Sequence, residues 1–248
     1  MLKNIIYYLL NLTFYNFEKK LIELTSKKKK LTIFDVGCFK GFFFRKFYHS
    51  NKLRNKRKKF YLFDVNPNVK KYLSTYIKKK NINFHYSAIG DKNKKGRYNF
   101  NRFFESSGSS MSNIYKNDKL WVQSRKLFLR FFFQKTPDHQ SIIIPVITLD
   151  SFVKKNKVKK IDILKIDVDG SEEEVLRGMK SVLKKSIISI ILVEITAKKK
   201  IFYLKENRII SFLKRNNFKL ILKKNVFSVS ILSNLKCTDN LFVHEIIK

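Results

Sequence analysis

The stretch Leu31-Thr-Ile-Phe-Asp-Val-Gly-Cys-Phe-Lys-Gly41 decides the expected fold. Its first six residues are typical of a buried strand, and the acid Asp35 lies near the end of that strand. Glycines at positions 37 and 41 allow the backbone to approach a ligand closely, beside a helix predicted over Lys40–His49. The glycine spacing is not G-x-G-x-x-G, and the Gly-Lys-Ser/Thr ending of a Walker A loop is absent. A diphosphate cofactor is therefore disfavoured.

Strands and helices are expected to alternate from this stretch to the end of the chain. Further strands are predicted over Phe60–Phe63, Ile82–Ser87, Ile142–Ile147, Ile161–Ile166, Ile187–Val193, Phe218–Leu222 and Asn240–Ile246. Further helices are predicted over Pro67–Lys79, Leu149–Lys155, Ser171–Leu183 and Phe202–Asn216. Such alternation predicts a parallel sheet that is covered on both faces.

An insertion at about residues 92–140 interrupts the alternation. It contains an extra strand predicted over Tyr98–Phe104 and a basic, aromatic-rich helix predicted over Leu120–Phe133. Long insertions in such folds often carry substrate specificity, so we expect this one to shape the acceptor site.

The residues before the first strand predict an amphipathic helix. Apolar side chains recur there at steps of three and four, namely Ile6, Leu10, Phe14, Phe17, Leu21 and Leu24. We expect residues 1–30 to form this helix and a basic linker, and residues 31–248 to form one domain. The helix is expected to dock on the sheet of the domain. A membrane-surface anchor, aided by Lys3, Lys19 and Lys20, is the alternative.

Composition limits the classes of protein to which the chain can belong. The chain has 248 residues, and 44% of them are apolar, which suffices for a full core and excludes a disordered polymer. Two cysteines exclude a disulfide scaffold and an all-Cys zinc site. The apolar stretch near the start is too short to span a bilayer, and no signal-peptide cleavage site follows it. A cytoplasmic protein is expected, with peripheral membrane contact as an addition.

The charge is strongly positive, with 54 Lys+Arg against 19 Asp+Glu and a net charge of +35. Lysine outnumbers arginine greatly, and Lys, Ile, Asn, Phe and Tyr together make up about half of the chain. All five are encoded by A/T-rich codons, so genome composition explains the charge without a function. A polyanionic partner is the alternative. Nucleic acid is a disfavoured partner, because its binding sites usually enrich arginine.

In so basic a chain the positions of the acids are informative. Asp35, Asp64, Asp167 and Glu194 each lie at the end of an apolar strand, the edge at which open α/β sheets bind ligands. Helix capping, or for Glu194 a salt bridge to a lysine, is the structural alternative. Asp64, in Phe63-Asp-Val-Asn-Pro67, suits hydrogen bonding to ribose hydroxyls. With the glycine turn, it points to adenosine without a diphosphate, and hence to S-adenosylmethionine.

A third motif is Lys165-Ile-Asp-Val-Asp-Gly-Ser-Glu172. The carboxylates of Asp167 and Asp169 can bind a cation, act as a base or hold an ammonium group. Glu194 suggests a pocket acid with a raised pKa. Cys38 lies inside the glycine turn, where its backbone can contact the cofactor, but a nucleophilic role lacks a base nearby.

In combination these motifs resemble the FkbM family of S-adenosylmethionine-dependent methyltransferases, over roughly residues 31–222. Besides the stretches above, the resemblance rests on Ser87-Ala-Ile-Gly-Asp91, Ser107-Gly-Ser-Ser110, Thr148-Leu-Asp150 and Val175-Leu-Arg-Gly178. It implies a Rossmann-like class I methyltransferase fold, with a seven-stranded, mostly parallel sheet whose last strand is antiparallel. Phe39 departs from the family pattern, which often has Asn there, and Asp64-Val65 replaces the usual Glu-Pro.

The resemblance also implies positions around the cofactor. The methionine part would be bordered by Asp35, Gly37 and Gly41, with Cys38 in the same turn. The ribose would be held by Asp64, followed by Val65, and the adenine would lie near Ala88 and Ile89. Asp167 would face the transferred methyl group or the cofactor's amino group.

The implied reaction is O-methylation of a hydroxyl, on a small molecule, a sugar, a glycan or a lipid-linked saccharide. We expect Asp167 or Glu194 to act as the base, and a divalent cation bridging to Asp169 is an alternative that is not predicted. An RNA methyltransferase and a non-catalytic binding protein on the same fold are the competing functions.

Overall fold

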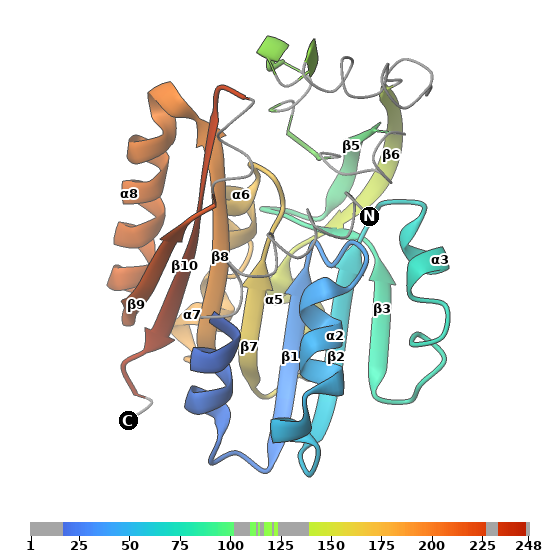
Figure 1. Ribbon diagram of the computed structural model, residues 1–248, viewed down its shortest axis with the longest axis vertical. Coiled ribbons are helices and arrows are strands. Elements are labelled where there is room, and N and C mark those ends of the chain that lie inside the picture. Colours follow the sequence, from blue (N-terminus) through green and yellow to red (C-terminus); the bar gives the residue numbers. More distant parts are fainter. Residues whose placement is uncertain are drawn as a thin grey trace, which may run out of the picture.

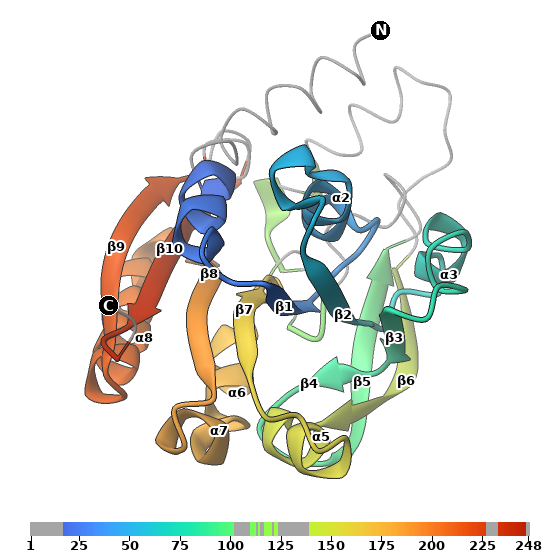
Figure 2. The ribbon, with the colours of Figure 1, turned by 90° about the horizontal axis from the view of Figure 1, so that it is seen from below.

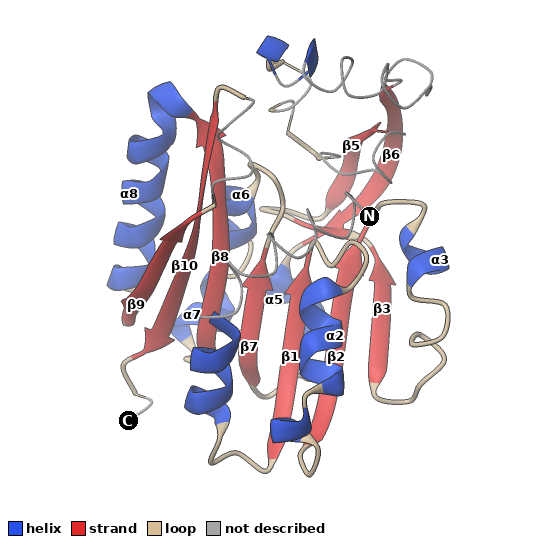
Figure 3. Ribbon diagram, in the orientation of Figure 1, coloured by secondary structure: helices blue, strands red, loops and turns tan. Residues whose placement is uncertain are grey.

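Strands and helices alternate in a computed structural model that describes residues 17–101, 110–112, 114, 117–120, 122–123, 139–226 and 233–246 (Figures 1 and 3). The strands are β1 Lys30–Val36, β2 Arg57–Asp64, β3 Ile82–Tyr86, β4 Ala88–Ile89, β5 Lys94–Asn101, β6 His139–Ile147, β7 Ile161–Ile166, β8 Ile188–Lys198, β9 Phe218–Asn225 and β10 Leu235–His244. The helices are one over residues 17–25, α2 Phe42–His49, η1 Asn51–Leu53, α3 Val69–Tyr72, α5 Leu149–Lys155, α6 Glu172–Arg177, α7 Lys180–Lys184 and α8 Lys199–Arg215.

A seven-stranded sheet forms the middle layer, in the order β3-β2-β1-β7-β8-β10-β9. The strands from β3 to β8 in this order pair in parallel, whereas β10 runs antiparallel to both β8 and β9. The predicted Rossmann-like fold with an antiparallel last strand is thereby confirmed. Strand order reverses between β1 and β7, and open α/β sheets bind ligands at the carboxyl ends of the strands beside such a reversal.

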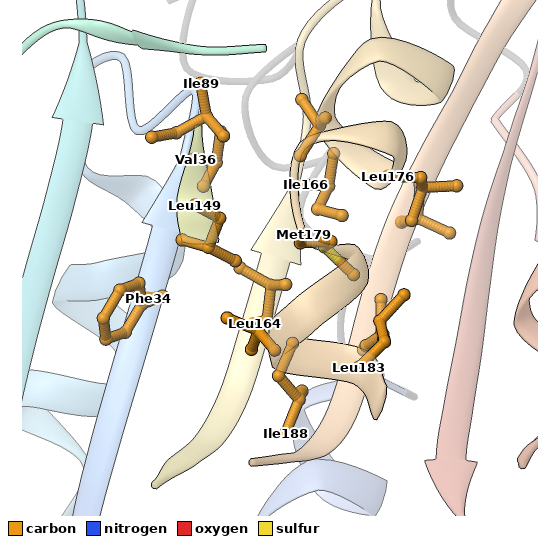
Figure 4. Close-up of a cluster of buried hydrophobic side chains, with 14 of the residues drawn as sticks. Phe34, Val36, Ile89, Leu149, Leu164, Ile166, Leu176, Met179, Leu183 and Ile188 are labelled. Atoms are coloured by element: carbon orange, nitrogen blue, oxygen red, sulfur yellow. The ribbon is translucent and has the colours of Figure 1, made fainter. Parts of the chain in front are cut away.

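Two apolar clusters fill the two faces of this sheet (Figure 2). One lies beneath α5, α6, α7 and α8, and Figure 4 shows part of it, with Phe34 and Val36 of β1 near Leu164 and Ile166 of β7. The other lies beneath α2 and α3. Successive side chains of a strand point to opposite faces, so these buried strands are apolar on both sides.

The helix over residues 17–25 packs on the same face as α2. Phe17 and Leu21 are fully buried in the cluster that also contains Ile33 of β1. This contact agrees with the docking that was expected for the N-terminal helix. Residues 1–16 of the expected helix lie outside the described residues, and the domain boundary at residue 31 stays a prediction.

A second, three-stranded sheet has the order β4-β6-β5. The strand predicted over Ile142–Ile147 is β6, and it pairs with β5 in antiparallel fashion instead of joining the central sheet. Much of the insertion, including residues 102–109 and 124–138, lies outside the described residues. The helix predicted over Leu120–Phe133 falls mostly there.

The helix predicted over Pro67–Lys79 is shorter than expected. Only Val69–Tyr72 is α-helical, and the guanidinium of Arg45 donates to the carbonyl oxygen of Tyr72 at 2.6 Å. The amide of Tyr76, which would continue the helix by binding that oxygen, donates to Leu73 instead. A contact from a distant part of the chain thus lies at the end of the helix.

The helix predicted over Ser171–Leu183 divides into α6 and α7 at Gly178. A Cβ atom on Gly178 would lie 1.8 Å from the carbonyl oxygen of Gly90, so two backbone segments meet here without side chains. The Gly178 carbonyl accepts from the Asp150 amide at 3.0 Å. The Asp150 carboxylate in turn accepts from the amides of Ser181 and Val182 at the start of α7. These motif residues therefore hold the fold together.

Within the described residues, no helix combines the length and apolar character that crossing a membrane requires.

Gly178→Ala tests the backbone contact between Gly178 and Gly90. We expect a loss of more than about 2 kcal/mol in unfolding free energy, because the new methyl group meets a carbonyl oxygen that cannot rotate away. Gly96→Ala is the matched control, since its Cβ would meet side-chain atoms of Val146 and Ile144 and no backbone atom. Urea unfolding of both variants measures the difference. An equal or smaller loss for Gly178→Ala would contradict the tight contact.

Candidate functional site

Four acidic residues and one glycine form a lateral row at the carboxyl edge of the central sheet. Strand register places in this row one residue from each of five adjacent strands or from the position just beyond it. From β2 across to β10, they are Asp64, Gly37, Asp167, Glu194 and Asp239. The sheet therefore brings together the acids that the sequence predicted at separate strand ends.

The carboxylates of this row share a face of the sheet with the helices at residues 17–25 and α2. Leu62, Leu192 and Leu241 lie two positions from Asp64, Glu194 and Asp239, and all three leucines pack in the cluster beneath α2. Residues two apart on a strand point the same way. The row thus extends the apolar cluster into a charged rim.

Gly37 is the member of this row that has no side chain. A Cβ atom there would lie 1.7 Å from the carbonyl oxygen of Asp167, and the φ angle of Gly37 is +82°. The amides of Gly37 and Cys38 both donate to the Phe63 carbonyl, at 2.9 and 3.1 Å. Glycine is therefore required by the close approach of two strand ends, and no side chain fills the row between Asp64 and Asp167.

Asp64 shapes the glycine turn from the neighbouring strand. Its Oδ2 accepts from the Phe39 amide at 2.7 Å, and its Oδ1 accepts from the Asn66 amide at 2.8 Å. Phe39 has a φ angle of 44°, in the left-handed region that the turn requires. Burial raises the pKa of Asp64, and the two amides oppose that rise. Each carboxylate oxygen keeps a second lone pair for further hydrogen bonds.

Asp35 lies two residues before Gly37 on β1. It is fully buried and lies directly beside Lys165 in the strand register. Neither carboxylate oxygen of Asp35 has a hydrogen-bond partner among the described residues. Burial raises the pKa of Asp35 to about 6, although the Lys165 ammonium lowers it. A buried carboxylate without a hydrogen-bond partner is costly, which makes Asp35 a candidate ligand-binding group.

Lys165 supplies positive charge beneath the row. Its ammonium contacts Asp167 Oδ2 at 2.6 Å and lies over the ring of Phe43. Although burial opposes ionisation, the carboxylates of Asp167, Asp35 and Glu194 raise the pKa of Lys165. Lys165 therefore stays charged and reduces the repulsion among its acidic neighbours.

Asp167, Asp169 and Glu194 come together beside this lysine. One carboxylate oxygen from each lies within 4.8 Å of the other two. A divalent cation can bridge such a group, and so can an ammonium group of a ligand. The Lys165 ammonium already provides one positive charge here, so the group does not by itself require a metal ion.

Asp239 is a member of the row that the sequence reasoning missed. It lies directly opposite Glu194 in the antiparallel pairing of β8 with β10, and it is almost fully buried. Burial raises the pKa of Asp239 to about 7, and the nearby charge of Asp167 adds to this rise. Burial also raises the pKa of Glu194, with contributions from Asp167 and Asp239. The signal was available, because Asp239 directly precedes the predicted strand Asn240–Ile246.

The turn after β7 is held from both sides. Glu172 is fully buried, accepts from the Gly170 amide at 2.7 Å and pairs with the Lys205 ammonium of α8. On the other side, the hydroxyls of Ser110 and Ser112 donate to the Asp169 carbonyl at 2.9 and 2.6 Å. Glu172 and the serines thus position the Asp167–Asp169 turn.

Val65, Ala88 and Ile89, predicted near the ribose and the adenine, do not all lie in the same cluster. Val65 is buried in a small cluster with Ala88 packed against it, beside the three-stranded sheet. The Ile89 side chain points into the core near Val36 and Leu149 (Figure 4), so only the backbone of Ile89 can face a ligand. Tyr86, paired with Asp64 in the register, is an exposed aromatic side chain at this end of the row.

Cys38 and Gly41, also predicted at the cofactor, each pack against other parts of the fold. Cys38 is buried, and burial with the charges of Asp64 and Asp35 raises the pKa of its thiol. Its side chain is thus a poor nucleophile. Gly41 is the N-cap of α2, with a φ angle of 75°, and a Cβ atom there would lie 2.7 Å from Leu73.

Comparison with solved structures finds the same fold. A methyltransferase FkbM from Methylobacillus flagellatus KT has a TM-score of 0.50 and 12% sequence identity, covering 86% of this chain and 44% of that one. A putative rRNA-methylase from Clostridium thermocellum has a TM-score of 0.45 and 10% identity, covering 91% and 95%. A putative tRNA (m1A22) methyltransferase from Streptococcus pneumoniae has a TM-score of 0.42 and 9% identity, covering 91% and 72%.

At such low sequence identity, the likeness to the Methylobacillus protein shows the fold alone. This chain spans less than half the length of that protein. Among curated proteins, no relative matches the chain. The model of one family, described as the methyltransferase FkbM domain, matches residues 35–220. That range contains Asp35, Gly37, Asp64, Asp167 and Glu194, and it covers most of the chain. The chain therefore belongs to the methyltransferase FkbM domain family.

Proposed function

We propose that this chain is an S-adenosylmethionine-dependent O-methyltransferase that acts on a hydroxyl of a sugar, a glycan or a lipid-linked saccharide. The observation that carries the proposal is the glycine turn at Gly37, where two strand ends meet between the carboxylates of Asp64 and Asp167. Membership of the family supports methyl transfer. Oxygen as the atom that receives the methyl group, and the saccharide class, rest on the resemblance of the motifs.

The residues present fit this cofactor. Its methionine part carries an ammonium group, and the unpartnered carboxylate of Asp35 is a matching acceptor beside Gly37. Asp64 has lone pairs left for the ribose hydroxyls, and Tyr86 beside it offers a ring to the adenosine. Val65 and Ala88 would form an apolar wall near the adenine, with the Ile89 backbone beside them. When bound, S-adenosylmethionine supplies a methyl group on a positively charged sulfur.

The chain's own residues would orient the acceptor and take its proton. Asp167 already binds Lys165 through Oδ2, which fixes its position. Glu194 is the better proton acceptor, because burial and its acidic neighbours raise its pKa. Asp239 opposite would share that proton. Asp169 would help to position the acceptor hydroxyl.

An RNA acceptor is the second candidate, favoured by the net charge of +35. The two functions differ in how binding depends on salt. An RNA complex that neutralises many phosphates weakens steeply as salt increases, whereas a neutral saccharide complex does not.

Calorimetric titration with S-adenosylmethionine and S-adenosylhomocysteine tests the cofactor. We expect micromolar binding of both, lowered at least about tenfold by Asp64→Ala, because the ribose and the glycine turn lose a shared acceptor. Glu23→Ala removes a carboxylate from an exposed ion pair on the N-terminal helix and is the matched control. Repeating the titration with Mg²⁺ tests the bridging cation. No binding by folded protein would contradict the enzyme, and unchanged affinity in Asp64→Ala would displace the ribose.

Asp35→Asn separates function from stability. Because the folded pKa, about 6, lies above the ordinary value of 3.8, ionisation of Asp35 destabilises the fold above pH 6. Without cofactor at pH 8, we expect the variant to gain on the order of 2 kcal/mol in unfolding free energy. This gain should shrink as pH falls from 6 towards 4.

In the same variant, we expect S-adenosylmethionine affinity to fall by about tenfold or more, because the carboxylate for the ammonium group is gone. Thermal unfolding across pH and calorimetry measure the two effects. A variant that is less stable at pH 8, or that binds the cofactor normally, would contradict the role given to Asp35.

A further inference from the structure

The start of α8 presents an apolar and basic surface that neither the fold nor the proposed reaction uses. It consists of Lys200, Ile201, Tyr203 and Leu204, and we call it the α8 entry surface. The side chains of Ile201, Tyr203 and Leu204 are 50%, 60% and 63% exposed. Three large apolar side chains exposed within four residues differ from the single ones that protein surfaces commonly carry.

These side chains point outward because of the helical repeat. Ile201 and Leu204 are three residues apart and Lys200 and Leu204 four apart, so they lie side by side on one face. The opposite face of α8 is buried, with Phe202 and Ile209 in the core. Figures 1 and 2 show α8 on the outer flank of the domain. The exposed residues are thus additional to the face that the core requires.

The charge around this surface favours a negatively charged partner. Lys198, Lys199 and Lys200 are all exposed at the amino end of α8, and the first turn contains no acid. Cations are disfavoured at this positive end of a helix dipole, so a bound anion would offset the cost of their placement. The Lys236 ammonium donates to the Tyr203 hydroxyl at 2.6 Å and lies 4.1 Å from its ring centroid, which holds this ring in place.

We propose that the α8 entry surface docks this protein on a membrane that carries anionic phospholipids. Ile201 and Leu204 would enter the boundary between headgroups and acyl chains, and the Tyr203 ring would lie at the headgroup level. The lysines would contact lipid phosphates. Single-stranded RNA is less suitable as the partner, because Ile201 and Leu204 offer no flat surface on which bases stack and Tyr203 is the one ring among the four residues.

The position of this surface connects it with the acidic row. β8 continues from Glu194 for four residues to Lys198 and passes directly into α8. Docking would therefore bring the carboxyl edge of the sheet close to the membrane, where a lipid-linked saccharide presents its hydroxyls. This inference goes beyond the proposed reaction and stands independently of it, because vesicle binding requires neither cofactor nor acceptor.

Co-sedimentation of the full chain with phosphatidylcholine vesicles, with and without phosphatidylglycerol, tests the docking. A chain this basic also binds anionic vesicles through its charge alone, so the measurement is made at about 0.15 M and about 0.5 M salt, where exposed charges are largely screened. The test variant combines Ile201→Asn with Leu204→Asn. The control is Ile246→Asn, an equally exposed aliphatic (74%) beyond β10, at the opposite edge of the sheet.

We expect the parent and Ile246→Asn to bind anionic vesicles and to keep part of that binding at high salt, within about twofold of each other. We expect the double variant to lose at least about tenfold in partitioning at high salt, while its circular dichroism and S-adenosylmethionine affinity stay unchanged. Equal binding by the double variant and the parent would overturn the proposal. So would a loss of affinity for transfer RNA, measured in parallel, in place of a loss on vesicles.

Discussion

The buried ammonium of Lys165 allows several carboxylates to share one edge of the sheet. It contacts Asp167, lies beside Asp35 in the strand register, and attracts the carboxylate of Glu194. This charge lowers the pKa values of Asp35 and Glu194, which burial and the neighbouring acids raise. The row that follows from it places carboxylates on both sides of Gly37, which suits a ligand that carries positive charge.

Motifs of the family combine two kinds of residue in this chain. Some keep free acceptors or lack a side chain, as Asp35 and Gly37 do. Others serve the architecture: Glu172 holds the turn after β7, Gly178 allows two backbones to meet, and Asp150 caps α7. A motif therefore locates the site, while hydrogen bonds show which of its side chains remain available for a ligand.

Local patterns predicted the succession of strands along the chain and the glycine turn, because apolar runs and glycine spacing are properties of neighbouring residues. The features that were wrong or missed depend on distant contacts. The helix after Pro67 ends where Arg45 takes the Tyr72 carbonyl, and Asp239 joins the site only through its pairing with Glu194. The row itself follows from strand register, which no single stretch of sequence contains.

A crystal structure with bound S-adenosylhomocysteine would locate the cofactor. If the row at the carboxyl edge is the cofactor site, the ligand lies over Gly37, with its ribose against Asp64 and its amino group within hydrogen-bond distance of Asp35. A ligand bound elsewhere on the domain, with the Asp35 oxygens still unpartnered, would contradict that site. The same map would show whether Glu194 and Asp239 face the sulfur side of the ligand.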